Sequence, residues 1–201
     1  MKNSFYFFLA LVGLLSSQCT RHEIAAPNPR TPRIDYDQVS TQLMQDLATK
    51  ITGTWILQKV LVKHNPRIYN RTFVKLTRDS TFINLARLTI RPAAVPRSSP
   101  RDLRRGEYDG AIEYGGKTYP VQFDIRAHHT WLVNKQGPQG LFLFQYRFPD
   151  GSSHTVEPEE AFLADLGLIN DNFSLEVGNE QSKMVWRGLN RGVEQIDLVR
   201  Q

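Results

Sequence analysis

Cysteine is almost absent from this chain of 201 residues, because Cys19 is the only one. A disulfide within the chain needs two cysteines, so the folded part must be stabilised by packing alone. The chain also lacks a Gly-x-Ser-x-Gly motif, and no cysteine after Cys19 offers a thiol nucleophile. With no other catalytic constellation in view, we expect no enzymatic activity and no cofactor.

Long hydrophobic stretches are missing too, apart from one apolar run over residues 5–15. This run is shorter than the ~20 residues that a membrane-spanning helix needs. It follows Lys2 and precedes small residues that end at Cys19, which is the order found in a secretory signal peptide. The segment resembles a bacterial lipoprotein signal, which implies cleavage after residue 18 and a lipidated Cys19. The alternative is a chance cysteine beside an ordinary cleavage site.

Three prolines mark residues 19–38 as a flexible tether, since proline removes a backbone donor and disfavours helix before it. Residues 39–201 are long enough for one domain with a core. We therefore expect a protein of the bacterial cell envelope, anchored in the lipid bilayer through Cys19. The outer membrane is preferred to the inner one, with the soluble domain in the periplasm or at the cell surface.

Charge is distributed unevenly along the chain. Residues 63–105 contain eleven basic and two acidic side chains, whereas residues 106–201 contain eight basic and fourteen acidic ones. A long loop is predicted over residues 92–105, and five arginines lie in or beside it: Arg91, Arg97, Arg101, Arg104 and Arg105. Because arginine forms paired hydrogen bonds with phosphate and carboxylate, this loop predicts binding of anionic lipid or polysaccharide. The alternative is a solvated loop, and nucleic acid is not an expected partner of a secreted chain.

Hydrophobic periodicity predicts two helices. The first covers residues 36–50, where Val39, Leu43 and Leu47 repeat at helical spacing. We expect Asp37 or Ser40 to cap its start. The second covers residues 158–166, because proline suits the first turn of a helix, acidic residues follow it, and a glycine stands after the end.

The rest of the chain reads as strands. Branched and aromatic residues between turn signals predict strands at 54–63, 69–77, 81–90, 107–114, 117–126, 129–134, 141–148, 173–177, 183–187 and 193–200. Gly115 and Gly116 supply the positive φ angles of a tight hairpin turn. A second hairpin is expected between 69–77 and 81–90. Many short antiparallel strands must hide their edges, and either a closed barrel, which removes them, or a sandwich, which only shields them, would do so.

The motif Gly53-Thr54-Trp55 follows the first predicted helix and resembles the start of a lipocalin-like (calycin-type) barrel. Residues 184–187 and 193–200 resemble the closing strands of that family. The resemblance implies an all-β antiparallel barrel in which strand 54–63 pairs with strand 193–200. It also implies that Trp55 closes one end and packs on an arginine, here Arg187 or Arg200. The whole chain resembles a bacterial lipoprotein with a lipocalin-like domain.

Six aromatic residues are candidates for lining a ligand pocket: Phe123, Trp131, Phe142, Phe144, Tyr146 and Phe148. Alternate residues of strand 141–148 share one face, which favours a site for a small apolar or amphipathic ligand. The alternative is a core filled by these side chains, and then the protein would present loop 92–105 to an anionic partner in the envelope. No metal site is expected, because adjacent residues such as His128 and His129 point to opposite faces of a strand.

Overall fold

The computed structural model describes residues 34–69, 74–94, 107–148, 156–178 and 180–201. Its compact unit runs from Asp35 to Gln201. Several sequence predictions lie outside the described residues: the signal peptide, Cys19, the tether up to residue 33, and Arg97, Arg101, Arg104 and Arg105 of the predicted loop. No helix in the described part of the chain is long and apolar enough to cross a membrane.

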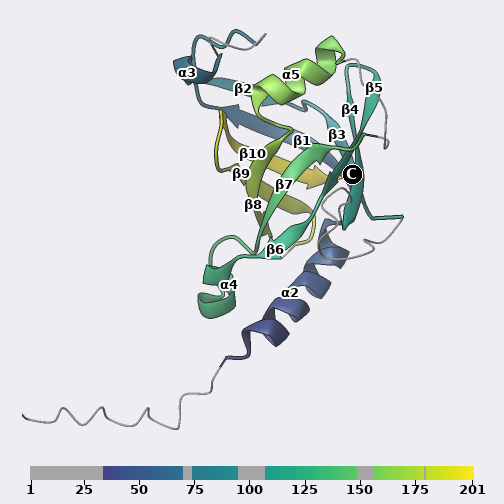
Figure 1. Ribbon diagram of the computed structural model, residues 1–201, viewed down its shortest axis with the longest axis vertical. Helices are drawn as coiled ribbons and strands as arrows, with labels where there is room; N and C mark the ends of the chain where they lie inside the picture. Colours follow the sequence, from purple (N-terminus) through teal and green to yellow (C-terminus); the bar gives the residue numbers. More distant parts are fainter. Residues whose placement is uncertain (1–33, 70–73, 95–106, 149–155, 179) are drawn as a thin grey trace, which may run out of the picture. The chain divides into compact units, whose positions relative to one another are not determined.

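In the described part of the chain, ten strands form one antiparallel sheet (Figure 1). In chain order they are β1 (Gly53–Val62), β2 (Ser80–Ile83), β3 (Arg87–Pro92), β4 (Tyr108–Tyr114), β5 (Lys117–Phe123), β6 (Ile125–Ala127), β7 (Gly140–Tyr146), β8 (Asp171–Val177), β9 (Lys183–Gly188) and β10 (Val193–Arg200). The helices are α2 (Tyr36–Ile51), α3 (Pro66–Tyr69), α4 (His129–Asn134) and α5 (Pro158–Leu166).

The sheet closes into an eight-stranded barrel, which confirms the predicted all-β fold class. Pairing follows the order β1-β3-β4-β5-β7-β8-β9-β10, and β10 pairs back with β1. The closing ladder runs from the pair Trp55 and Arg200 to the pair Val62 and Val193, with two register shifts. The short strands β2 and β6 continue β3 and β5, because they pair with β1 and β7 respectively.

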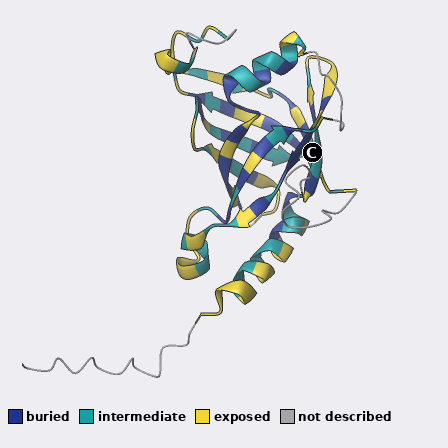
Figure 2. Ribbon diagram, viewed as in Figure 1, coloured by how far each residue is buried: buried dark blue, intermediate teal, exposed yellow. Residues whose placement is uncertain are grey.

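The interior of the barrel follows from alternation along each strand. Side chains of a strand point to opposite faces in turn, and β7 buries Gly140, Phe142, Phe144 and Tyr146 while the residues between them are more exposed. Figure 2 shows this pattern of buried and exposed residues along the strands. The inward faces of all the barrel strands join α2 and α5 in one hydrophobic core.

Two predicted strands are wrong. Among the described residues of the predicted strand 69–77, Tyr69 ends helix α3 and residues 74–77 are irregular. The predicted hairpin with 81–90 is therefore absent among the described residues, and both halves of 81–90 pair with β1 instead. Those halves are separated at Asn84, whose φ of 49° breaks the extended backbone.

Residues 129–134 form helix α4 rather than a strand. The side chain of His128 accepts a hydrogen bond from the backbone N–H of Thr130, and this N-cap starts the turn. Lys135 then ends the helix in the left-handed conformation, with its N–H donating to the carbonyl of Trp131. Local capping thus outweighs the β propensity of Thr130, Trp131 and Val133.

The other predicted elements are confirmed. Strands β4 and β5 form a hairpin at Gly115 and Gly116, which both have positive φ. Helix α5 begins with a capping box between Glu157 and Glu160 and ends at Gly167. Helix α2 is also present, although its N-cap is Asp35, which accepts from Gln38 N, rather than Asp37 or Ser40.

Candidate functional site

The predicted ligand-binding aromatic residues fall into two groups. Four of them, Phe123, Phe142, Phe144 and Tyr146, are buried inside the barrel. The ring of Phe123 lies 5.3 Å from that of Phe142 and 5.7 Å from that of Phe144. Phe148 follows the end of β7 and is 46% exposed. Trp131 lies on α4, outside the barrel wall.

Trp186 of β9 fills the space beside this aromatic group. Its ring centroid is 4.7 Å from that of Phe142, 5.2 Å from that of Phe144 and 5.8 Å from that of Phe173. Phe144, Phe173 and Trp186 are each at most 1% exposed. A ligand-sized cavity beside these side chains would leave their inward surfaces accessible. The described side chains therefore fill this part of the barrel themselves.

One end of the barrel is closed by α2 and by the pair Trp55 and Arg200. The Arg200 guanidinium lies 4.6 Å above the centre of the Trp55 ring. It donates hydrogen bonds to the backbone carbonyls of Lys50, Thr52 and Gln181, and Trp55 Nε1 donates to Ile51 O at 2.7 Å.

Gly53 is required by this closure. Its φ is +134°, and a Cβ at that position would lie 2.7 Å from Arg200 Nη1. Of the two arginines considered from the sequence, Arg200 is thus the one on Trp55. Arg187 instead donates to Gln195 on an exposed face.

The other end is covered by α5 and the turn that follows it. Leu163, Leu166, Leu168 and Ile169 are fully buried there. The Phe162 ring stacks on Tyr114 of β4 at 5.3 Å and meets Phe82 of β2 edge-on at 6.0 Å. Both ends of the barrel are therefore occupied by helices packed against its core.

A polar network holds α5 on the β4–β5 hairpin. Lys117 Nζ lies 2.9 Å from Glu157 Oε2 and 3.0 Å from Glu159 Oε2, and Tyr119 donates to Glu157 at 3.0 Å. Burial, followed by this hydrogen bond, raises the pKa of Tyr119 to about 12. The hydrogen bond of Glu159 to its own backbone N–H, followed by that to Lys117, lowers the pKa of Glu159.

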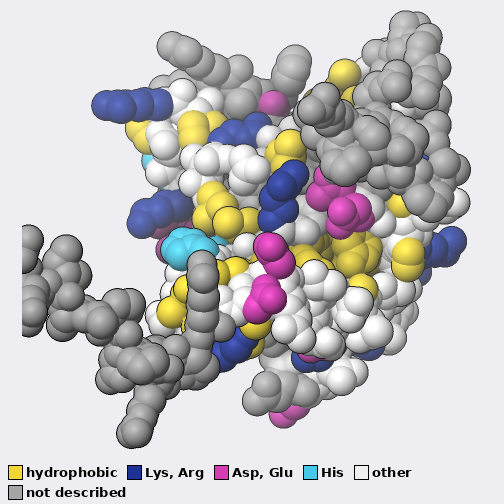
Figure 3. Space-filling view, turned by 60° about the horizontal axis from the view of Figure 1, so that its bottom comes forward, with side chains coloured by type: hydrophobic (Ala, Val, Ile, Leu, Met, Phe, Trp, Pro, Cys, Tyr) yellow, Lys and Arg dark blue, Asp and Glu magenta, His cyan; other side chains and the backbone are white. Residues whose placement is uncertain are grey.

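A groove of about 580 Å³ separates α2 from α4. It is lined by four apolar residues and six polar or charged ones. The apolar ones are Val39, Leu43, Leu47 and Trp131, and the others are Gln38, Gln42, Asp46, Lys50, Lys135 and Gln139. Figure 3 looks onto this end of the molecule, where hydrophobic side chains are exposed beside acidic and basic ones. Trp131 thus lines an external groove rather than the interior of the barrel.

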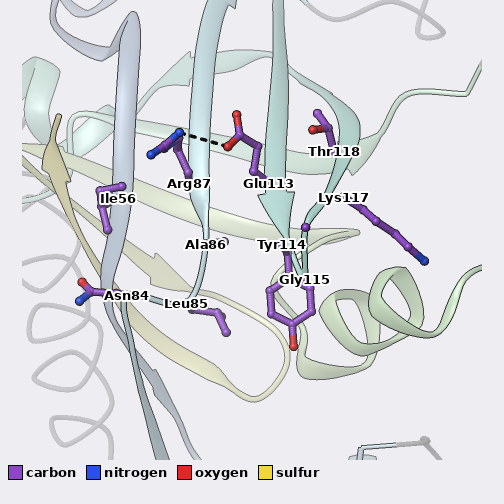
Figure 4. A pocket seen from close by; sticks show the side chains of 11 residues that line it. Ile56, Asn84, Leu85, Ala86, Arg87, Glu113, Tyr114, Gly115, Lys117 and Thr118 are labelled. Atoms are coloured by element: carbon purple, nitrogen blue, oxygen red, sulfur yellow. Dashed lines mark hydrogen bonds and ion pairs between the residues drawn. The ribbon is translucent and has the colours of Figure 1, made fainter.

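A second groove, of about 650 Å³, lies on the wall between the β2–β3 connection and the β4–β5 turn. Figure 4 shows Leu85 and Tyr114 on one side of it and the pair Arg87–Glu113, at 3.3 Å, on the other. Because Tyr114 is held by Phe162 of α5, this groove ends at the helix that covers the barrel.

The predicted anion-binding arginines are represented by Arg91 alone among the described residues. It is exposed on β3, opposite Asp109 of β4. Asp109 pairs with Arg147 at 2.9 Å and accepts from Ala94 N at 3.1 Å. The start of loop 92–105 is thereby fixed to the barrel wall.

The groove beside Trp131 was not predicted from the sequence. Val39, Leu43 and Leu47 were identified as the apolar stripe of a helix, but the partner of that stripe was unknown because α4 was predicted as a strand. No sequence pattern around Lys50 or Lys135 indicated a binding role for either residue. Within the described ranges, no group of three or more His, Cys, Asp or Glu residues is placed to hold a metal ion.

Comparisons with protein-family models, curated proteins and solved structures find no match to this chain.

Proposed function

We propose that this protein is a lipid-anchored lipoprotein of the bacterial cell envelope whose lipocalin-like barrel is a rigid scaffold for binding at its outer surface. Binding at the outer surface, rather than inside, is supported by the packed interior of the barrel. Aromatic side chains meet one another at the centre, and α2 and α5 occupy the two ends. A barrel that takes a small ligand inside needs free volume and an open end.

Native mass spectrometry and thermal unfolding test the scaffold role. We expect protein purified from its own host to keep its melting temperature after organic extraction removes bound lipid, since no interior ligand supports the core. A ligand that binds only the folded protein stabilises it, and its removal lowers the melting temperature. A stoichiometric molecule would show an interior site and refute the scaffold role if its removal both lowers the melting temperature by several degrees and shifts the emission of Trp131→Phe, whose remaining tryptophans are buried in the barrel.

The anchor is proposed from the sequence order of Lys2, residues 5–15 and Cys19. We expect a labelled fatty acid fed to the producing cells to be incorporated into the protein, and Cys19→Ser to abolish that incorporation. The wild-type protein should enter the detergent phase on phase separation, and the variant should stay in the aqueous phase. Labelling that persists in the variant would rule out Cys19 as the lipidated residue.

The arginine-rich loop is a second candidate surface, favoured by the same packed interior and by eleven basic residues between positions 63 and 105. Binding to heparin or to anionic vesicles should weaken steeply with salt, because exposed charges are screened. Replacing Arg101, Arg104 and Arg105 together with serine should remove that binding. Replacing Arg126, Lys183 and Arg187, which are exposed and lie outside residues 63–105, with serine is the control. An equal loss there would show only an effect of net charge.

A further inference from the structure

The apolar stripe of α2 is longer than the barrel requires. Leu47 and Ile51, near its C-terminal end, are buried in the core. Leu43 is only partly buried, and Val39, one turn earlier, lies outside the hydrophobic core cluster. Figure 1 shows the N-terminal turns of α2 extending past the barrel, in the region where α4 lies. Among the described residues, part of the apolar face of α2 is therefore left without a covering layer.

Helix α4 forms the opposite wall and is held firmly. His128 N donates to Gln139 O at 2.9 Å, and Trp131 N donates to His128 O at 3.1 Å. The buried Gln139 side chain accepts from Val177 N at 2.8 Å and donates to Val177 O at 3.2 Å. Trp131 is therefore presented on a wall fixed to β8, and the groove exists before a ligand arrives.

The charges that line the groove favour an anion. Lys50 and Lys135 contribute two ammonium groups, and Asp46 contributes one carboxylate. Gln42 Nε2 donates to Asp46 Oδ1 at 2.9 Å, so that carboxylate is already hydrogen-bonded. A ligand with a negative head group would balance the excess of positive charge.

We propose that the groove between α2 and α4 binds a single-chain anionic amphiphile. Its carboxylate or phosphate head pairs with Lys50 and Lys135, and its alkyl chain runs along Leu43 and Val39 against Trp131. Val39 and Lys50 are about 17 Å apart along the axis of α2, which is long enough for an extended alkyl chain. This site gives a ligand class to the outer-surface binding proposed above, and it rests on that proposal.

A monomeric ligand fits this end better than the surface of an anionic bilayer. Asp35 and Asp37 are exposed at the start of α2, where an anionic bilayer would meet them. Like charges repel at such a surface, whereas a single chain can lie between the helices away from both carboxylates. The bilayer remains a distinct outcome of the experiment below.

The tryptophans of the protein provide the assay. Of the three, Trp55 and Trp186 are buried in the barrel, and Trp131 lies in the groove. The full chain carrying Cys19→Ser is titrated with sodium dodecanoate and dodecyl phosphate, each below its micelle concentration. We expect a blue shift of the emission with either head group, and no shift in Trp131→Phe, whose remaining tryptophans report on the interior. Circular dichroism checks that this variant is folded.

Matched probes and variants separate the two parts of the ligand. A buried methylene is worth roughly fourfold in affinity, so octanoate should bind at least tenfold more weakly than dodecanoate. Dodecyltrimethylammonium, with the same chain and a cationic head, should not bind. Lys50→Glu and Lys135→Glu should each weaken dodecanoate at least fivefold. Lys63→Glu, at an exposed position outside the groove, makes the same charge change and should leave binding unaltered.

Each unfavourable outcome has a separate meaning. If neither anionic probe shifts the emission, or if both groove variants bind like the Lys63→Glu control, the amphiphile site is refuted while the scaffold role stands. A shift that persists in Trp131→Phe would place the ligand inside the barrel and refute both proposals. A response to vesicles of dioleoylphosphatidylglycerol, without one to monomeric dodecanoate, would replace the amphiphile site with docking on a bilayer.

Discussion

At one end of the barrel the permanent cation of Arg200 lies on Trp55 and donates to three backbone carbonyls. At the other end Lys117 and Tyr119 contact carboxylates at the start of α5, and every side chain of this network can gain or lose a proton. Arginine stays protonated and backbone carbonyls do not titrate. The α2 end should therefore be insensitive to pH, whereas the α5 end depends on the protonation of several groups.

The two ends also differ in how the covering segment is attached. The α2 end contains the closing pair of β1 and β10 and the tightly packed Gly53. Helix α5 has nine residues and is held from outside by the β4–β5 hairpin and Arg191, which donates to Asp171, Ala164, Ile169 and Asn170. We expect changes at the α2 end to affect the whole barrel and changes around α5 to affect mainly its cover.

Truncation of Trp55 should have the largest effect. Trp55→Ala removes a fully buried ring and leaves a cavity, which costs about 3–5 kcal/mol in the free energy of unfolding. Urea unfolding followed by circular dichroism measures this loss. Trp131→Ala, on a partly exposed helix, is the control and should cost far less. If both variants lost a similar free energy of unfolding, Trp55 would contribute no more to stability than a tryptophan at the surface.

Loss of Arg200 should have the next largest effect on the free energy of unfolding. Arg200→Ala leaves three carbonyls without their donor and removes the cation from Trp55, at a cost of about 2–3 kcal/mol. Arg187→Ala is the matched control on the neighbouring strand, where the arginine donates only to Gln195. The Arg200→Ala loss should be constant between pH 5 and pH 9, and a pH-dependent loss would contradict the comparison of the two ends.

A substitution at Tyr146 tests how α5 is attached to the interior of the barrel. Its hydroxyl donates to Glu160 O at 2.8 Å in a buried setting, and burial, followed by the charge of Glu160, raises its pKa. Tyr146→Phe should cost about 1 kcal/mol in unfolding free energy. Tyr36→Phe, at an exposed position, should cost nothing measurable. Hydrogen exchange should show faster exchange in α5 in Tyr146→Phe, and unchanged protection there would contradict the expected role.

The smallest effect is the pH dependence of the α5 network. The pKa of Glu159 is lowered in the folded protein, so its contribution to stability is present above the usual carboxyl range and is lost as pH falls through the lowered value. The pKa of Tyr119 is raised from 10.0 to about 12, so stability falls as pH rises from 10 towards 12.

Melting temperatures measured from pH 3 to pH 12 follow the loss of stability at low pH (the acid limb) and at high pH (the alkaline limb). Glu159→Gln should flatten the acid limb slightly, and Tyr119→Phe should flatten the alkaline one. The same substitution types at Glu194 and Tyr36, which are exposed, serve as controls. Acid limbs of equal steepness in Glu159→Gln and the wild type would show that Glu159 does not contribute to holding α5.

The sequence predicted the elements whose local and global signals agree. The two glycines of the β4–β5 turn, the Pro158 start of α5 and the final strand each had a turn or helix-start signal beside a matching periodicity. The pairing of β1 with β10 was implied by the resemblance of Gly53-Thr54-Trp55 and of the last two strands to a lipocalin-like barrel. These features made the barrel predictable without any measured contact.

One misread segment explains why the candidate groove was not found. In residues 129–134 a cap formed by His128 decides the conformation, and branched residues there gave the opposite signal. The position of α4 beside α2 depends on Gln139 and Val177, which are far apart in the sequence from α2. Whether the aromatic side chains would fill the barrel or line a cavity depends on packing detail, which periodicity does not contain.

Closure of the barrel has a consequence for the order of folding. Arg200 and Thr52 share a hydrogen bond although 148 residues separate them along the chain, and contacts between such distant segments form slowly. Until the last strand docks, β1 and β10 each present a bare row of amide and carbonyl groups to neighbouring chains. We therefore expect this protein to be most prone to aggregate between its synthesis and the docking of the last strand.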